Sequence, residues 1–205
     1  VAPDSTGRIY PAQNRIQWYP LKNAFLTGRI IAENKDSVGE NSFASGFESR
    51  AKGRYSQALG YKTIARGDYS TAIGKNAIAN GINSFAFGEN AYAKNVESYS
   101  LGRGAIAKGF RSFSFGSAGV DSAGQVTGVA YANGDYSFAI GQGSQSLGVG
   151  SFAIGIADTA KGDFSLAAGH LNSARGVYST ALGVLTKANA YAAISLGYKT
   201  YAGGG

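Results

Sequence analysis

The stretch GDYSTAIGKNAIAN, Gly67 to Asn80, decides the fold because the chain repeats it every fourteen residues. Eleven copies align between Gly39 and Gly203, among them GRYSQALGYKTIAR directly before it and GINSFAFGENAYAK directly after it. A fixed short period is typical of a solenoid, in which each turn contacts only its neighbours. We number the positions of each copy from 1 to 14, so that Gly67 holds position 1 and Gly74 position 8.

Glycine dominates two positions of the repeat. Position 8 is Gly in every copy, and position 1 is Gly except at Asn95 and Ala190. Because Gly adopts backbone shapes that a side chain would strain, glycines seven residues apart predict two corners per turn. The 31 Gly argue against helices, and all three Pro lie in the first twenty residues. The sequence therefore predicts an all-β solenoid whose coils run strand, corner, strand, corner.

The first strand of each copy alternates small and large residues. Ser42 and Ala44 represent one face, which carries almost only Ser or Ala, and successive strand residues point to opposite faces. We expect the small face to fill a thin coil interior, with Ala51, Ala65, Ala79, Ala93 and Ala107 from the second strand. The large residues would then point outward. We assign to this apolar column Phe85, Phe87, Phe113, Phe115, Phe138, Ile140, Phe152, Ile154, Leu182 and Leu196.

Nothing in one copy of the chain covers the apolar column. Each large side chain is worth about 1.5–3 kcal/mol when buried, and an exposed column of them favours aggregation. A parallel homo-oligomer with the columns on a shared axis is the simplest remedy. Gln57, Thr71 and Thr180 interrupt the column, so this core would not be uniformly apolar.

The repeat resembles the YadA-like head of trimeric autotransporter adhesins, whose coils carry motifs of the type S-[VF]-A-[IF]-G in a fourteen-residue period. The matching segments include YSTAIG (Tyr69 to Gly74), YSFAIG (Tyr136 to Gly141) and GSFAIG (Gly150 to Gly155). The resemblance implies a left-handed parallel β-roll, a parallel homotrimer and an adhesin head with a role in virulence. It also implies an extracellular place on a bacterial surface, with outer-membrane anchoring through parts outside this chain.

The limits of the repeat divide the chain into three segments. Residues 1–38, which contain the only Trp, Trp18, are expected to cap the open end of the roll, and a separate ligand-binding tip is the alternative. Residues 39–203 form the head of about eleven coils. Residues 204–205 would begin a linker or mark a cut end, because the neck and stalk usual in the family do not follow. The missing Met suggests that Val1 is not the native start.

The residues needed for catalysis or metal binding are scarce. The chain has no Cys, and its only His, His170, falls on a position expected to face solvent. No phosphate-binding, dinucleotide or calcium-binding motif is present. We therefore predict no enzyme, cofactor or metal site. No apolar run approaches the ~18 residues of a membrane helix, so this fragment should not insert into a membrane.

Position 14 carries the surface charge most suited to binding. We name its cations the basic ladder: Lys52, Arg66, Lys94, Lys108, Lys161 and Arg175. Such a ladder attracts anionic glycans or matrix proteins, whereas no aromatic platform beside it indicates nucleic acid. Alternatively, the charges only keep the edge soluble and unpaired.

An insertion at residues 117–130 interrupts the repeat. Its layout around DSAG predicts a small hairpin, with Asp121 and Gln125 as candidate ligand-binding residues, although a neutral insertion is as consistent with the pattern. Arg66-Gly67-Asp68 matches the integrin-binding tripeptide. The repeat also produces Lys161-Gly162-Asp163, so we interpret the tripeptide as a product of the repeat.

These features favour a non-enzymatic adhesin head that binds host matrix or glycan ligands through many weak sites. The alternative is a structural spacer of a surface fibre, or of the tail fibre of a phage or injection system, whose receptor-binding tip lies elsewhere.

Overall fold

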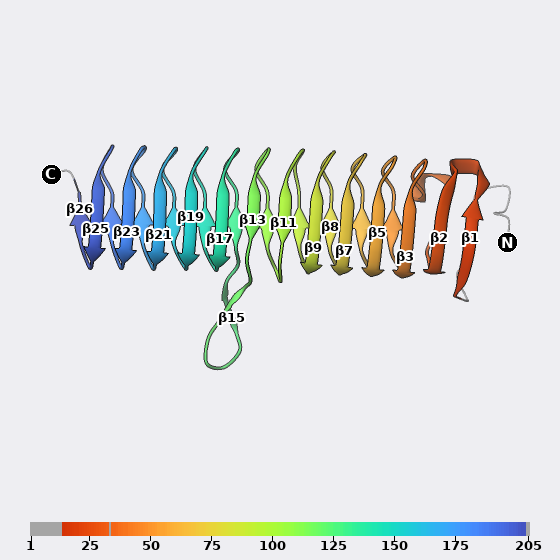
Figure 1. Cartoon of the computed structure of the whole chain (residues 1–205), viewed down its shortest axis with the longest axis horizontal. Coiled ribbons are helices and arrows are strands. Elements are labelled where there is room, and N and C mark those ends of the chain that lie inside the picture. The colour runs from red at the N-terminus through yellow and green to blue at the C-terminus, as the bar shows by residue number, and fades with distance from the viewer. Residues whose placement is uncertain (1–13, 33, 204–205) are drawn as a thin grey trace. The chain divides into compact units, whose positions relative to one another are not determined.

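The computed structural model describes residues 14–32 and 34–203, and the expected linker at residues 204–205 lies outside this range. The chain divides into two compact units, Val1–Glu97 and Ser98–Gly205. Figure 1 shows the strands of each unit as arrows. The fold of each unit is all-β. The short turns η1 (Pro20–Lys22) and η2 (Lys35–Ser37) are the only helical elements among the described residues.

Each repeat of unit 1 gives one long and one short strand. The long strands are β3 (Phe43–Phe47), β5 (Gln57–Tyr61), β7 (Thr71–Lys75) and β9 (Phe85–Glu89), and the short strands are β4 (Arg50–Ala51), β6 (Ile64–Ala65), β8 (Ile78–Ala79) and β10 (Tyr92–Ala93). Strands of one kind pair in parallel, one period apart, so Ala44 is opposite Ala58 and Ala58 opposite Ala72. The two kinds form separate sheets, which enclose the interior.

Unit 2 is built in the same way. Its long strands are β11 (Tyr99–Leu101), β13 (Phe113–Phe115), β17 (Phe138–Gln142), β19 (Phe152–Ile156), β21 (Leu166–His170), β23 (Thr180–Val184) and β25 (Ile194–Tyr198). The short strands are β12 (Ile106–Ala107), β16 (Tyr131–Ala132), β18 (Gln145–Ser146), β20 (Thr159–Ala160), β22 (Ser173–Ala174), β24 (Lys187–Ala188) and β26 (Tyr201–Ala202). The predicted parallel solenoid is thus confirmed in each unit. Its left-handedness and its three-chain assembly stay predictions.

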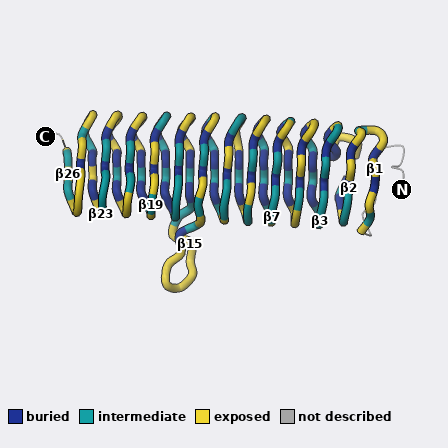
Figure 2. The backbone as a smooth tube through the Cα atoms, in the orientation of Figure 1, coloured by how far each residue is buried: buried dark blue, intermediate teal, exposed yellow. Residues whose placement is uncertain are grey.

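Small residues fill the interior of the coils, as the alternation predicts. Ala44, Ala58 and Ala72 on the long strands are fully buried, and so is Ala79 on the second sheet (Figure 2). The structure adds an inward position that the sequence analysis missed, position 11, just before the short strand. Its buried residues are Ser49, Thr63, Ala77, Ala91, Ala105, Ala130, Ser144, Asp158, Asn172 and Thr186.

Serine at position 4 does more than fit a thin coil. The Ser56 hydroxyl donates to the carbonyl oxygen of Gly53 at 2.6 Å, and Ser70 does the same to Gly67. The same Gly53 carbonyl also accepts the Ser56 amide at 3.3 Å, so the hydroxyl adds a second bond to the corner and is itself satisfied in the dry interior. This bond explains why position 4 prefers Ser to Ala. The same bond recurs in other coils, at Ser84, Ser112, Ser151 and Ser165.

The corners differ from the expectation that glycine makes them. Left-handed backbone falls at positions 3 and 10, where ordinary residues such as Tyr69 (φ 57°) and Lys62 (φ 53°) occupy it. Gly60 and most other position-8 glycines lie within the long strands, with φ between 108° and 135°, whereas Gly102 and Gly116 directly follow β11 and β13. A Cβ at positions 1 or 8 would meet the backbone carbonyl of the next coil, as Gly67 would meet Gly81. The close stacking of coils therefore accounts for Gly in every copy at position 8 and favours it at position 1, where Asn95 and Ala190 are the exceptions.

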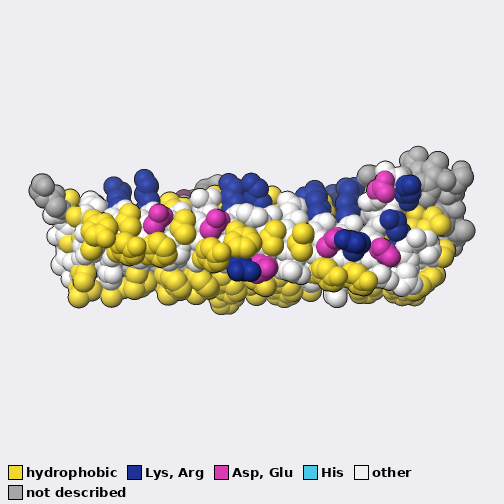
Figure 3. All heavy atoms as spheres, turned by 90° about the horizontal axis from the view of Figure 1, so that it is seen from above, with side chains coloured by type: hydrophobic (Ala, Val, Ile, Leu, Met, Phe, Trp, Pro, Cys, Tyr) yellow, Lys and Arg dark blue, Asp and Glu magenta, His cyan; other side chains and the backbone are white. Residues whose placement is uncertain are grey.

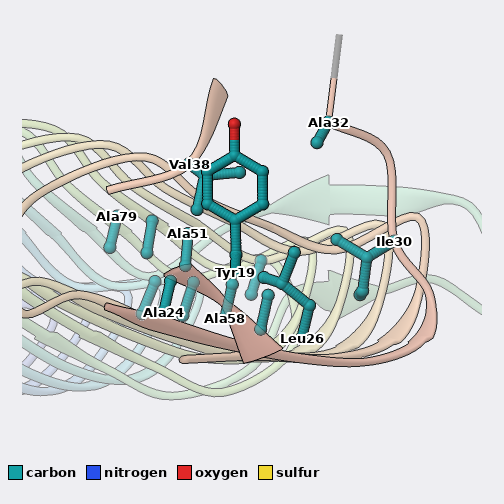
Figure 4. Packing of buried hydrophobic residues seen from close by; sticks show 14 of the residues in the cluster. Tyr19, Ala24, Leu26, Ile30, Ala32, Val38, Ala51, Ala58 and Ala79 are labelled. Atoms are coloured by element: carbon teal, nitrogen blue, oxygen red, sulfur yellow. The ribbon is translucent and has the colours of Figure 1, made fainter. Parts of the chain in front are cut away.

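The N-terminal segment adds two strands to the first coil. β1 (Arg15–Tyr19) pairs antiparallel with β2 (Ala24–Arg29), which pairs in parallel with β3. Tyr19, Leu26 and Ile30 are buried over the alanines of the coil interior (Figure 4). The capping role stays a prediction, which this plug of large apolar side chains favours.

Position 11 becomes a buried polar ladder in the later coils. The Asn172 side chain accepts from the Thr186 amide at 3.0 Å and donates to the Gly183 carbonyl at 2.7 Å. Asp158 Oδ1 accepts from the Asn172 amide and side chain, but Asp158 Oδ2 is buried without a partner. Burial raises the pKa of Asp158 above its ordinary value, and the bonds from Asn172 offset only part of this shift.

The stacking of coils predicts that Gly183→Ala is severely destabilising. A Cβ at Gly183 would lie 2.8 Å from the Gly197 carbonyl carbon and closer still to its oxygen, at a φ of 127°. We expect a loss of more than about 3 kcal/mol in the free energy of unfolding. Ala192→Gly, at an exposed left-handed corner with φ 53°, is the matched control and should change it by less than about 1 kcal/mol. Urea unfolding measures both, and equal losses would contradict the stacking argument.

The Asp158 carboxylate predicts a stability that falls as pH rises. Because the folded-state pKa is raised above the unfolded value of about 3.9, the native state binds the proton more tightly, and stability is greatest below that pH. Asp158→Asn would reproduce the bonding of Asn172 and should stabilise the protein at pH 7 by about 1–3 kcal/mol. The two proteins should converge near pH 4 in thermal unfolding. A difference that does not vary with pH would refute the role of the carboxylate.

Candidate binding surfaces

The apolar column lies on the outer face of the long-strand sheet in each unit. In unit 1, Phe87 exposes 48% of its surface beside Phe85. In unit 2, Phe115 exposes 52%, and the rings of Phe138 and Phe152 stack with centroids 4.6 Å apart. The partly buried members of the column are Phe85, Phe113, Phe138, Ile140 and Leu182, whereas Phe152, Ile154 and Leu196 are exposed. One chain thus leaves the column open.

Trp18 belongs to this outer face. It is opposite Phe25 in the β1–β2 pair, and Phe25 is opposite Phe43, with their rings stacked 5.6 Å apart. Trp18 exposes 55% of its surface, and Ile16 on the same side of β1 is also exposed. The geometry therefore makes Trp18 a continuation of the apolar column of unit 1.

The basic ladder lies just after the short strands, on the opposite side of the coil from the apolar column. Within each unit, seen from the edge where the chain enters the long strands, Lys and Arg gather along one border and apolar side chains along the other (Figure 3). Arg66 donates to Asn80 Oδ1 at 2.6 Å, and Lys108 donates to the Tyr131 hydroxyl at 3.2 Å. None of the ion pairs among the described residues involves a member of the ladder. Its charges therefore remain available to an external anion.

The Arg66-Gly67-Asp68 tripeptide is held within the corner. Asp68 Oδ1 accepts the Arg54 amide at 2.9 Å, and Oδ2 accepts two bonds from the Arg54 guanidinium. The Arg54 amide and then its side chain hold the pKa of Asp68 below its ordinary value. Asp135 and Asp163 accept the equivalent amides in their own corners. Asp at position 2 thus satisfies an amide of the preceding coil, which favours the interpretation of the tripeptide as a product of the repeat.

Aromatic residues at position 3 form rows that the sequence analysis did not single out. Tyr55 and Tyr69 stack 5.1 Å apart in unit 1, and Phe164 and Tyr178 stack 5.4 Å apart in unit 2. Each ring covers one face of its neighbour, so the row presents ring edges. The recurrence of Tyr or Phe before the position-4 Ser was the available signal.

The insertion is a hairpin of two short strands. β14 (Gly119–Val120) pairs antiparallel with β15 (Val126–Gly128). Asp121 Oδ1 accepts the amides of Ala123 and Gln125 at 2.9 and 2.8 Å, so this candidate ligand residue stabilises the turn. Gln125 is exposed beside it. Between the hairpin and the coils lies a hollow of about 390 Å³ that no sequence pattern had indicated.

The described residues contain no cluster of His, Asp or Glu that could hold a metal ion. His170, on β21, is exposed, and no second His exists in the chain. A helix long and apolar enough to cross a membrane does not occur in the described part of the chain.

Fold and surfaces together define a class: a solenoid of fourteen-residue coils with a small-residue interior, an outward apolar column and a basic edge. The family model described as YadA head domain repeat matches residues 37–63, 51–77, 65–91, 79–98, 131–157, 160–185 and 174–200, more than half of the chain. The chain therefore belongs to the YadA head domain family, as its motifs predicted. This membership indicates an adhesin-like surface protein. A search of curated proteins found no match.

Proposed function

We propose that this chain is the head of a homotrimeric adhesin on a bacterial surface. Three apolar columns would meet on a common axis, and three basic ladders would face outward to bind anionic glycans or matrix proteins of a host. Membership of the YadA head family supports a surface role. The observation that carries the proposal is the pairing of an open apolar face with an unpaired basic edge on opposite sides of the same coils.

The apolar column supports the assembly. Phe87, Phe115 and Leu196 each expose about half of their surface, and they recur at the same position of their coils. Burying such residues is worth about 1.5–3 kcal/mol each, whereas an uncovered patch of this kind would promote aggregation. A parallel oligomer covers the residues of every coil in the same way, because each coil presents the same face.

The basic ladder supports binding of a polyanion. Lys52 and Arg66 lie on successive coils of unit 1, as Lys161 and Arg175 do in unit 2. Strands of adjacent coils lie about 4.7–4.9 Å apart, so the cations can face successive anionic groups of an extended polymer. Three chains would multiply each weak site, and avidity would then replace the affinity of any one site.

The assembly is tested by placing a charge on the column. Ile140→Asp should convert an oligomer of about three times the 21.1 kDa chain into monomer, measured by light scattering after gel filtration, because three carboxylates would be buried together. Ser173→Asp places the same charge on the outer face of the other sheet and should leave the oligomer intact. A monomeric parent protein, or dissociation by the control alone, would contradict the proposed axis.

The ligand is tested with immobilised heparin at two salt concentrations. Lys52→Ala with Arg66→Ala should weaken binding at least about tenfold at low salt, because two ladder charges are lost from each chain. Lys62→Ala with Lys75→Ala removes the same charge from cations already paired with Glu48 and Glu89, and should have a smaller effect. Absence of binding to heparin and to matrix proteins would instead favour a spacer with the tip elsewhere.

A further inference from the structure

The hollow under the inserted hairpin lies entirely within unit 2. One wall is the hairpin, with Gly119, Val120, Thr127 and Gly128. The other wall is the corner that leads from the long strands β17, β19 and β21 to the short strands. It contributes Gln142, Gly143, Gln145, Ile156, Ala157, Thr159 and Leu171. At about 390 Å³ the hollow has the size of a site for a small ligand.

Glycines bring the two walls together. An added Cβ on Gly128 would lie 3.7 Å from the Gly143 Cα, and one on Gly119 would lie 3.8 Å from the Gln142 Cγ. The Gly143 amide also donates to the Ser117 carbonyl at 3.2 Å, which ties the base of the hairpin to the coil. The hairpin therefore contacts the coil through backbone atoms, and these contacts hold the two walls of the hollow in place.

The polar side chains of the lining are neutral. Gln142 and Gln145 supply amides, and Thr127 and Thr159 supply hydroxyls. None of these four side chains makes a hydrogen bond within the described part of the chain. No Lys, Arg, Asp or Glu lines the hollow. The site therefore offers both donors and acceptors without net charge.

Apolar side chains complete the lining. Ile156 and Leu171 expose 49% and 45% of their surfaces, and Val120 is exposed on the hairpin opposite. A ligand that matches this lining needs one apolar face and a rim of hydroxyl or amide groups. A neutral hexose has this chemistry, because its C–H groups form a face and its hydroxyls both donate and accept.

We propose that the hollow between the hairpin and the coil corner binds a neutral saccharide. The amides of Gln142 and Gln145 and the hydroxyl of Thr159 bond its hydroxyl groups, and Ile156, Leu171 and Val120 contact its C–H face. This site goes beyond the proposed function, because it lies at the other corner of the coil from the basic ladder and needs no charge. Heparin binding and saccharide binding can therefore fail separately.

The test is saturation-transfer NMR on the full chain with methyl β-galactoside, methyl α-mannoside and N-acetylglucosamine. At least one should bind with a dissociation constant of about 1–10 mM, which corresponds to a few hydrogen bonds and one apolar contact. Gln142→Ala with Gln145→Ala should weaken binding at least tenfold. Asn83→Ala with Asn90→Ala is the matched control, because these exposed side-chain amides of unit 1 do not line the hollow, and it should leave binding unchanged.

A second readout places the ligand independently of any substitution. The methyl resonances of Ile156, Leu171 and Val120 should shift on titration, and those of Ile64 and Ile78 in unit 1 should not. Absence of saturation transfer from all three sugars, binding that survives the paired substitution, or preferential binding of glucuronate would overturn the proposal. Binding of a neutral peptide such as tri-alanine in place of the sugars would overturn it as well.

Discussion

The structure depends on the contact between the glycine backbones of successive coils. At positions 1 and 8, the space that a Cβ would occupy is taken by the carbonyl group of the next coil, as at Gly67 and Gly81. This contact keeps the coils in a common register, and the hydrogen bonds of both sheets rely on that register. One methyl group at such a position therefore acts on two coils at once.

A thin coil also decides where the large residues go. Because the interior holds only Ala, Ser and other small side chains, the hydrophobic residues that stabilise most domains lie on the outside in this chain. The plug of Tyr19, Leu26 and Ile30 is the exception, at the point where the repeat has not yet begun. The coils are thus ordered by backbone contacts and small side chains, whereas the apolar column stays exposed on a single chain.

The sequence predicted those parts of the fold that depend on residue type at a regular spacing. The fourteen-residue period, the parallel sheets and the inward Ser and Ala all follow from alternation and spacing, and the structure has them. The left-handed corner positions could not be found in this way, because Tyr69, Asn83 and Ala192 adopt the same backbone with unrelated side chains. The hollow under the hairpin was also out of reach, since it depends on the approach of Gly128 to Gly143 across an insertion whose seating no repeat specifies.

The insertion leaves the register of the coil unchanged. Phe113 on β13 is opposite Phe138 on β17, in the same way as Phe138 is opposite Phe152 on β19, although the first pair is separated by a far longer segment of chain. The cost of closing a longer loop grows only slowly with its length. The corner after position 8 can therefore accept an inserted loop without a change in the pairing of the strands. A loop at this corner can change and alter what the surface binds. The glycine contacts that hold the coils together can stay the same.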